Sequence, residues 1–132
     1  MAEVDVDEMR RELASISLVL KVDPSLMENL INEVVETVNS MGLRAEKRAE
    51  GYAFIPSIEA AVIGLPHLRL AHRGDLVTIW VRDPYALDGE RCERVGISAM
   101  ELHKLLVEGA RKIASIFKHY GKEGDTLTIS LP

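Results

Sequence analysis

Residues 67 to 83 read His-Leu-Arg-Leu-Ala-His-Arg-Gly-Asp-Leu-Val-Thr-Ile-Trp-Val-Arg-Asp, and this stretch decides much of the fold. Two runs of alternating polarity flank Arg73-Gly74, and a two-residue connection that contains glycine is typical of a β-hairpin. A turn at these two residues predicts the following cross-strand pairs: His72 with Asp75, Leu70 with Val77, Leu68 with Ile79, and His67 with Trp80.

This pairing sorts the hairpin into two faces, because successive side chains of a strand point to opposite sides. One face is apolar and consists of Leu68, Leu70, Val77, Ile79 and Val81. The other face consists of His67, Arg69, Thr78, Trp80 and Arg82. The only tryptophan of the chain is therefore expected among polar and cationic neighbours, away from the core.

The length and composition indicate an ordered globular protein. The 132 residues are 47% apolar, which favours a single α+β domain over residues 1–132. The one cysteine, Cys92, excludes an intrachain disulfide and argues against a cysteine-ligated zinc site. No apolar run approaches the roughly 20 residues of a membrane span, and the N-terminus is acidic, so we expect a cytosolic protein without a membrane partner.

Residue usage and charge add two expectations. The chain has no glutamine, and asparagine occurs only at positions 29, 32 and 39, which is a tendency of thermophile proteins. The net charge of −5 is uneven: residues 1–39 hold nine acids and three bases (−6), residues 40–82 hold four and six (+2), and residues 83–132 hold eight and seven (−1). The acidic first third argues against a general nucleic-acid coat, although a local basic surface on the central segment remains open.

Two helices are predicted from hydrophobic periodicity and capping residues. The first covers Ser25 to Met41, with Ser25 and Glu28 as a capping box and Gly42 as the stop. The second covers about Ala99 to Tyr120, with Ser98 and Glu101 repeating the box. An N-terminal helix is expected through about Leu13, followed by a strand over residues 15–22; a single continuous helix is the alternative for this segment.

The remaining segments predict further strands. Residues 43–49 and 52–56 form a second hairpin with a turn at Glu50-Gly51, and residues 126–131 alternate as a terminal strand. Residues 57–64 fit either a short helix capped by Ser57 or another strand. The resulting fold class is α+β: a two-layer sandwich with a mostly antiparallel sheet of four or five strands, two long helices on one face, an extra N-terminal helix, and a ferredoxin-like split βαβ topology.

This arrangement leaves one face of the sheet open, and hydroxyls, a few cations and Trp80 collect there. The expected members are Ser15, Ser17, Lys21, Arg69, Thr78, Trp80, Arg82, Thr126, Thr128 and Ser130. Three interpretations stay open: a solvated face, a self-association surface around Trp80 and Arg82, and a surface for RNA or another anionic ligand.

Catalytic motifs are not evident. His67 and His72 point to opposite faces, His103 and His119 are four turns apart, and no phosphate-binding glycine motif or nucleophile elbow occurs. We therefore predict no catalytic residue, no metal site and no cofactor. The connection from residue 83 to 96 carries Arg91 and Arg94 and precedes a capped helix, which favours anions there.

The sequence therefore favours a non-catalytic protein-interaction module, expected to be a homodimer, that uses the open face around Trp80. The alternative is a domain that binds RNA or a small anionic ligand with the same face and the 83–96 connection; an enzyme without a recognisable motif is the third hypothesis. The candidate binding residues are His67, Arg69, Thr78, Trp80, Arg82, Arg91 and Arg94.

Overall fold

The computed structural model describes residues 5–121 and 127–132. Within these ranges it contains five α-helices, one 3₁₀-helix and six strands. In chain order they are α1 (Val6–Ala14), β1 (Ser17–Lys21), α2 (Pro24–Ser40), β2 (Arg44–Arg48), β3 (Gly51–Ile55), α3 (Ile58–Val62), β4 (His67–Arg73), β5 (Leu76–Arg82), η1 (Pro84–Ala86), α4 (Gly89–Arg94), α5 (Ala99–Tyr120) and β6 (Leu127–Ser130).

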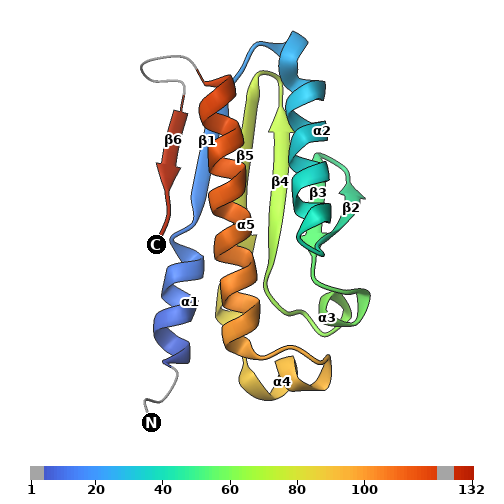
Figure 1. Ribbon diagram of the computed structural model, residues 1–132, viewed down its shortest axis with the longest axis vertical. Helices are drawn as coiled ribbons and strands as arrows, with labels where there is room; N and C mark the ends of the chain where they lie inside the picture. Colours follow the sequence, from blue (N-terminus) through green and yellow to red (C-terminus); the bar gives the residue numbers. More distant parts are fainter. Residues whose placement is uncertain (1–4, 122–126) are drawn as a thin grey trace.

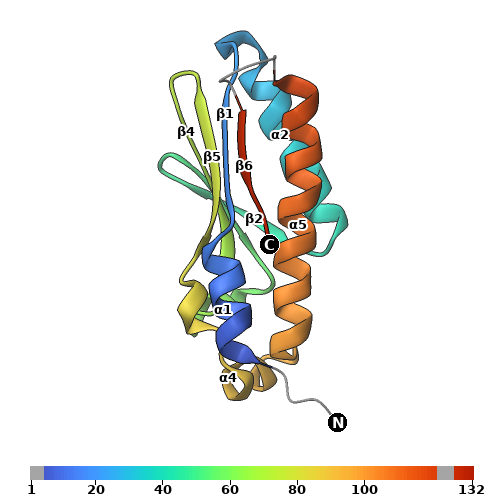
Figure 2. The ribbon, with the colours of Figure 1, turned by 90° about the vertical axis from the view of Figure 1, so that its left-hand side faces the viewer.

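The strands form one open sheet in the order β2-β3-β4-β5-β1-β6, and every described pair is antiparallel. The long helices α2 and α5 lie on the same side of this sheet (Figures 1 and 2). The α+β class is therefore confirmed, whereas the expected four or five strands are wrong, because β1 pairs with β6 on one side and β5 on the other. The sandwich and ferredoxin-like specifics of the prediction are not confirmed.

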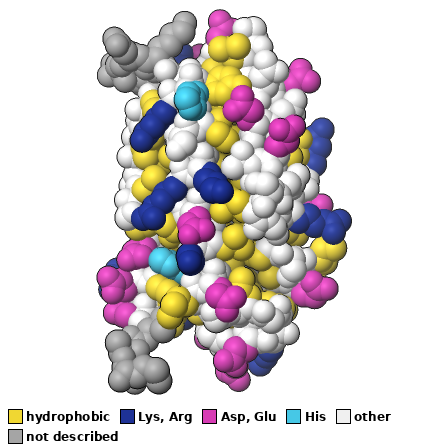
Figure 3. Space-filling view, in the orientation of Figure 1, with side chains coloured by type: hydrophobic (Ala, Val, Ile, Leu, Met, Phe, Trp, Pro, Cys, Tyr) yellow, Lys and Arg dark blue, Asp and Glu magenta, His cyan; other side chains and the backbone are white. Residues whose placement is uncertain are grey.

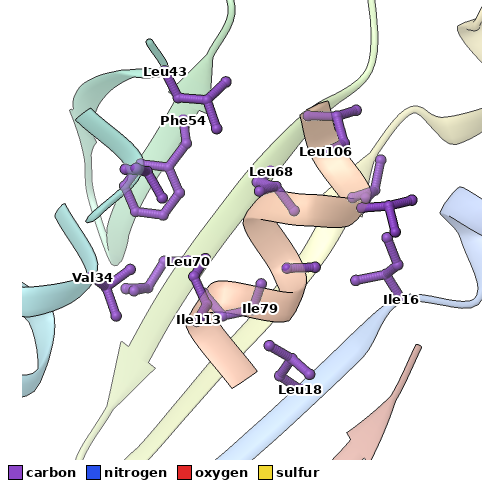
Figure 4. Close-up of a cluster of buried hydrophobic side chains, with 14 of the residues drawn as sticks. Ile16, Leu18, Val34, Leu43, Phe54, Leu68, Leu70, Ile79, Leu106 and Ile113 are labelled. Carbon is purple, nitrogen blue, oxygen red and sulfur yellow. The ribbon is translucent and has the colours of Figure 1, made fainter. Parts of the chain in front are cut away.

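The core lies between the helices and the sheet. The inward residues of the β4–β5 hairpin, among them Leu68, Leu70 and Ile79, are buried against residues of α5 such as Ile113 (Figure 4). Leu18 from β1 is fully buried in the same cluster. The apolar face that alternation predicts for the central hairpin thus forms the sheet side of the hydrophobic core.

The register of that hairpin differs from the prediction by two residues. The two loop residues are Gly74 and Asp75, so Arg73 pairs with Leu76, Arg69 with Trp80, and His67 with Arg82. Gly74 has φ +61°, and glycine at the first loop position is the requirement of a type II′ turn. Because a shift of two residues preserves alternation, both predicted faces are retained. All four expected pairs are therefore wrong: His72 with Asp75, Leu70 with Val77, Leu68 with Ile79, and His67 with Trp80.

The predicted helices are largely confirmed, with one change of cap. The helix over Ala99 to Tyr120 matches α5, and the Ser98 hydroxyl accepts from the Glu101 backbone N–H at 3.0 Å. In α2 the N-cap is Asp23, whose carboxylate accepts from the Ser25 backbone N–H at 2.9 Å. Ser25 therefore lies inside the helix and is not its cap.

The N-terminal alternatives resolve in favour of a helix followed by a strand, as α1 and β1 show. Ser15 follows α1 as its C-cap and lies outside β1, so it does not belong to the open sheet face as expected. Residues 57–64 contain the short helix α3, capped by the Ser57 hydroxyl. The predicted position of Thr126 lies outside the described residues.

Two connections differ from expectation. The β2–β3 hairpin turns at Ala49 and Glu50, because Arg48 pairs with Gly51. The 83–96 connection is not a long irregular loop: it contains η1 and α4. The Asp88 carboxylate accepts from the Arg91 N–H at 3.0 Å and caps α4. Cys92 on α4 is fully buried, and desolvation raises the pKa of its thiol, which disfavours the reactive thiolate.

Candidate functional site

The open side of the sheet, opposite α2 and α5, is the surface of interest. Cross-strand pairing places six side chains in one row along it: Glu46, Ala53, Arg69, Trp80, Ser17 and Ser130. Trp80 is half-buried in the middle of this row, with Arg69 on one side and Ser17 on the other. The prediction that Trp80 lies among polar neighbours away from the core is confirmed.

A hollow of about 470 Å³ opens on this face beside Trp80. It is lined by the turn of the β2–β3 hairpin, the middle of β4, and Trp80. The hairpin crosses the sheet at an angle, and its turn extends toward the side away from the long helices (Figure 2). We call this hollow the Trp80 hollow; its lining residues are Arg48, Ala49, Glu50, Gly51, Arg69, Leu70, Ala71 and Trp80.

Gly51 permits the close approach that shapes one wall of the Trp80 hollow. A Cβ at this position would overlap the Leu70 backbone carbonyl and lie 3.0 Å from the Ala71 Cα. The backbones of β3 and β4 are therefore closer here than any residue with a side chain allows. The His72 N–H donates to the Glu50 carbonyl at 2.8 Å, which holds the hairpin turn against β4.

The cations on the open face divide into two groups. Four of them have a carboxylate within 4 Å: Lys21 with Asp75 at 3.6 Å, Arg44 with Glu46 at 3.5 Å, Arg73 with Glu50 at 2.6 Å, and Arg82 with Asp83 at 3.8 Å. Arg48 and Arg69 have no acidic partner among the described residues, and both line the Trp80 hollow. The uncompensated positive charge of this face is therefore concentrated beside Trp80.

Arg69 has a buried hydrogen-bond donor, its Nε, for which the described residues supply no acceptor. Burial lowers the pKa of this guanidinium below its ordinary value, and repulsion from Arg82 and Arg48 lowers it further, against a smaller raising effect of the Asp83 carboxylate. Three arginines therefore lie close enough to disfavour one another's charge. Such a cluster becomes favourable when an anion lies among its members.

Replacement of Arg69 is expected to stabilise the fold slightly. Arg69→Met keeps an unbranched apolar stem beside Ala53 and removes a buried donor without a partner, so the free energy of unfolding should stay level or rise by up to about 1 kcal/mol. Urea unfolding of the two proteins measures this. Arg48→Met is the matched control and should bring no gain, because the Arg48 guanidinium is exposed and donates to the Lys47 carbonyl at 3.1 Å. A clear loss of stability in Arg69→Met would show that Arg69 is structural.

His67 borders the same cluster, opposite Arg82. Desolvation lowers the pKa of His67, and the charge of Arg69 lowers it further, against a raising effect of the Leu65 carbonyl, 3.5 Å from Nδ1. Its Nε2 is buried and has no partner among the described residues. The ring is therefore neutral at neutral pH, and this residue adds no charge to the cluster.

The lowered pKa of His67 predicts a pH dependence of stability. The unfolded chain binds a proton near the ordinary value of 6.5, whereas the folded protein resists it until lower pH. Stability is therefore complete above about 6.5 and falls as the pH drops below this value toward the folded pKa. Urea unfolding at neutral and mildly acidic pH should show a slope that His67→Asn reduces. The exposed His119, replaced by Asn, is the control and should leave this part of the slope unchanged.

The structure brings together some of the predicted site residues. His67, Arg69, Thr78, Trp80 and Arg82 share the open face, as expected. Arg91 and Arg94 lie exposed on α4 and do not line the Trp80 hollow. Sequence reasoning missed Arg48 and Gly51. The net positive charge of residues 40–82 was the available signal, because it includes both Arg48 and Arg69.

The opposite side of the molecule has a different character. On the helix-bearing face, acidic and basic side chains are interspersed (Figure 3). A hollow of about 450 Å³ lies between α2 and the β2–β3 hairpin, with Glu28, Lys47 and His72 in its lining. Glu12 of α1 lies 2.8 Å from the Nε2 of His103 on α5, which ties these helices together. No three side chains of the described residues combine into a metal-binding group of His, Cys, Asp or Glu.

Comparisons with protein-family models, with curated proteins and with solved structures find no match to this chain. None of the helices in the described ranges combines the length and apolar character that crossing a membrane requires.

Proposed function

We propose that this chain is a non-catalytic binding module that takes an anionic ligand into the Trp80 hollow. The observation that carries the proposal is the pair Arg48 and Arg69: among the described residues they lack acidic partners on a face where Lys21, Arg44, Arg73 and Arg82 have them, and the Arg69 Nε is buried without an acceptor. An anion that accepts from the terminal N–H groups of Arg48 and Arg69 offsets the repulsion among Arg48, Arg69 and Arg82.

The proposal assigns no catalytic step. The Trp80 hollow contains one carboxylate, Glu50, and Arg73 holds it in an ion pair at 2.6 Å. Among the described residues, no serine, cysteine, histidine or lysine lines this hollow. The lining thus offers donors and an aromatic surface for binding, without a nucleophile and base that could act together.

Calorimetric titration with pyrophosphate tests the proposal. Binding should weaken as the salt concentration rises, because each arginine engages a negative charge. Arg69→Gln and Arg48→Gln should each weaken it markedly. Arg94→Gln is the matched control, since this exposed arginine of α4 lies outside the hollow. Equal affinity in all four proteins, or none in the unchanged protein, would remove the proposal.

Self-association through the same face is the second candidate. It is favoured by the half-buried Trp80 and by Leu76, which lies on the same face at the end of β5 and is 44% exposed. Tryptophan and arginine are enriched among the residues that dominate protein interfaces. A two-fold dimer would, however, bring two arginine clusters near each other unless the contact is offset along the sheet.

Light scattering across a dilution series separates the two candidates. A stable dimer that Trp80→Ala converts to a monomer supports self-association. A monomer at all concentrations, with intact pyrophosphate binding, supports the anion-binding function alone. Arg94→Gln again serves as the surface control, because it should alter neither the mass nor the affinity.

A further inference from the structure

We propose that the ligand of the Trp80 hollow is a nucleotide unit, with its base stacked on Trp80 and its phosphate bound by Arg69 and Arg48. This inference rests on the proposed function and narrows its ligand class. The hollow joins a large aromatic side chain to two arginines without acidic partners. A planar base linked to a phosphate has the same two parts.

The donors of the hollow suit a phosphate. Arginine presents a planar fork of N–H groups that matches phosphate oxygens in pairs. Arg69 sits on β4 at the centre of the sheet, while Arg48 ends β2 at the hairpin turn, so the two guanidinium groups approach the hollow from different strands. Gly51 leaves no side chain between them. A phosphate in this position would accept from the terminal N–H groups of both arginines.

The surroundings of Trp80 suit a base. On the side away from Arg69, the row continues with Ser17 and then Ser130, which are short side chains. The cross-strand neighbours of Trp80 toward β1 and β6 are therefore short side chains that leave room for a base. The Ser130 hydroxyl donates to the Ser15 carbonyl at 2.8 Å, whereas the Ser17 hydroxyl has no hydrogen bond within the described residues. Ser17 is thus available to the edge of a stacked base.

The distribution of charge limits the site to about one nucleotide. Beyond Arg48 and Arg69, the neighbouring cations Arg44, Arg73 and Arg82 are each paired with a carboxylate. An anion without a base would make no stacking contact with Trp80. The further phosphates of a long nucleic-acid chain would lie beside arginines that are already paired with carboxylates. A free nucleotide and a single unit of RNA share the required chemistry, and the test separates these two sources.

Trp80 is the only tryptophan, so intrinsic fluorescence reports from the site itself. Titration with AMP should quench this fluorescence. AMP should bind about tenfold more tightly than ribose 5-phosphate, which lacks the base, because stacking on an aromatic side chain contributes that much or more. Adenosine, which lacks the phosphate, should also bind about tenfold more weakly than AMP.

Calorimetry on variants assigns the two contacts. Trp80→Ala should weaken AMP binding about tenfold, and Trp80→Phe should keep part of the AMP affinity. Arg69→Gln should weaken both ligands, and Arg94→Gln neither. Because one phosphate is bound by both arginines, a short oligoadenylate should show a slope of log affinity against log salt of about −0.7, which Arg69→Gln brings closer to zero.

The outcomes are distinct. If oligoadenylate binds more tightly than AMP, the natural ligand is a nucleotide unit of RNA. If the two bind with equal affinity per site, the natural ligand is a free nucleotide. Pyrophosphate binding with AMP no tighter than ribose 5-phosphate overturns the nucleotide inference and leaves the anion-binding function in place. If no anion binds at all, both the inference and the proposed function are overturned.

Discussion

Phe54→Ala is expected to lower the free energy of unfolding by about 3–5 kcal/mol, the usual loss for truncation of a buried aromatic side chain. Phe54 is fully buried on β3 and belongs to the same cluster as Val34 and Leu43 (Figure 4). Its ring stacks on Tyr52, with ring centroids 6.2 Å apart and planes 6° apart. The substitution removes the apolar anchor between the β2–β3 hairpin and the helix layer.

The matched substitution is Phe117→Ala on α5, which removes an equally buried ring far from the hairpin along the chain. Urea unfolding should give similar losses for the two variants. The folded Phe54→Ala protein should bind pyrophosphate more weakly than the folded Phe117→Ala protein. The reason is that Phe54, and not Phe117, belongs to the hairpin that carries Arg48 into the Trp80 hollow. A loss below about 1 kcal/mol for Phe54→Ala would mean that the hairpin is held mainly by the backbone ladder to β4.

The faces of the sheet could be predicted because they depend on alternation alone. An error of two residues in the β4–β5 register changes which residues are opposite each other but leaves Leu68, Leu70 and Ile79 buried. The turn itself was misplaced because the sequence around Gly74 allows two positions for a two-residue loop. The structure has the turn that puts glycine at the first loop position, where the backbone φ is positive.

The Trp80 hollow could not be predicted in the same way. Arg48 and Trp80 are 32 positions apart in the sequence. They line the same hollow because the β2–β3 hairpin pairs with β4 and crosses the sheet. Strand order of this kind follows from tertiary packing, which the local pattern of a strand does not contain. The net charge of residues 40–82 indicated a basic surface without showing which arginines would lack partners.

The 83–96 connection had a local signal that the prediction did not use. Asp88 precedes Gly89, and a carboxylate at this position commonly caps a helix; it accepts from the N–H of Arg91. The helix is too short for hydrophobic periodicity to reveal it, although Cys92 provides its buried side. Placing Arg91 and Arg94 on this helix separates them from the residues around Trp80.

Gly51→Ala is the second substitution with a large expected effect, about 3 kcal/mol at the upper end of what overpacking costs. The added methyl group would overlap the Leu70 carbonyl, which is backbone and cannot rotate away as a side chain can. The strands β3 and β4 must then separate at the hairpin turn. This weakens the bond from the His72 N–H to the Glu50 carbonyl, now 2.8 Å long.

Gly89→Ala is the matched control, because a Cβ at Gly89 meets nothing within 4 Å and α4 begins there in ordinary helical conformation. Its stability should change by no more than about 1 kcal/mol, in the stabilising direction. Urea unfolding measures the stability of the two variants. The fluorescence of Trp80 in the folded proteins shows whether the surroundings of this residue have changed. If Gly51→Ala is as stable as the unchanged protein, β3 and β4 do not approach as closely as described. In that case Arg48 would not be held beside Trp80, and the anion site would lose one of its two arginines.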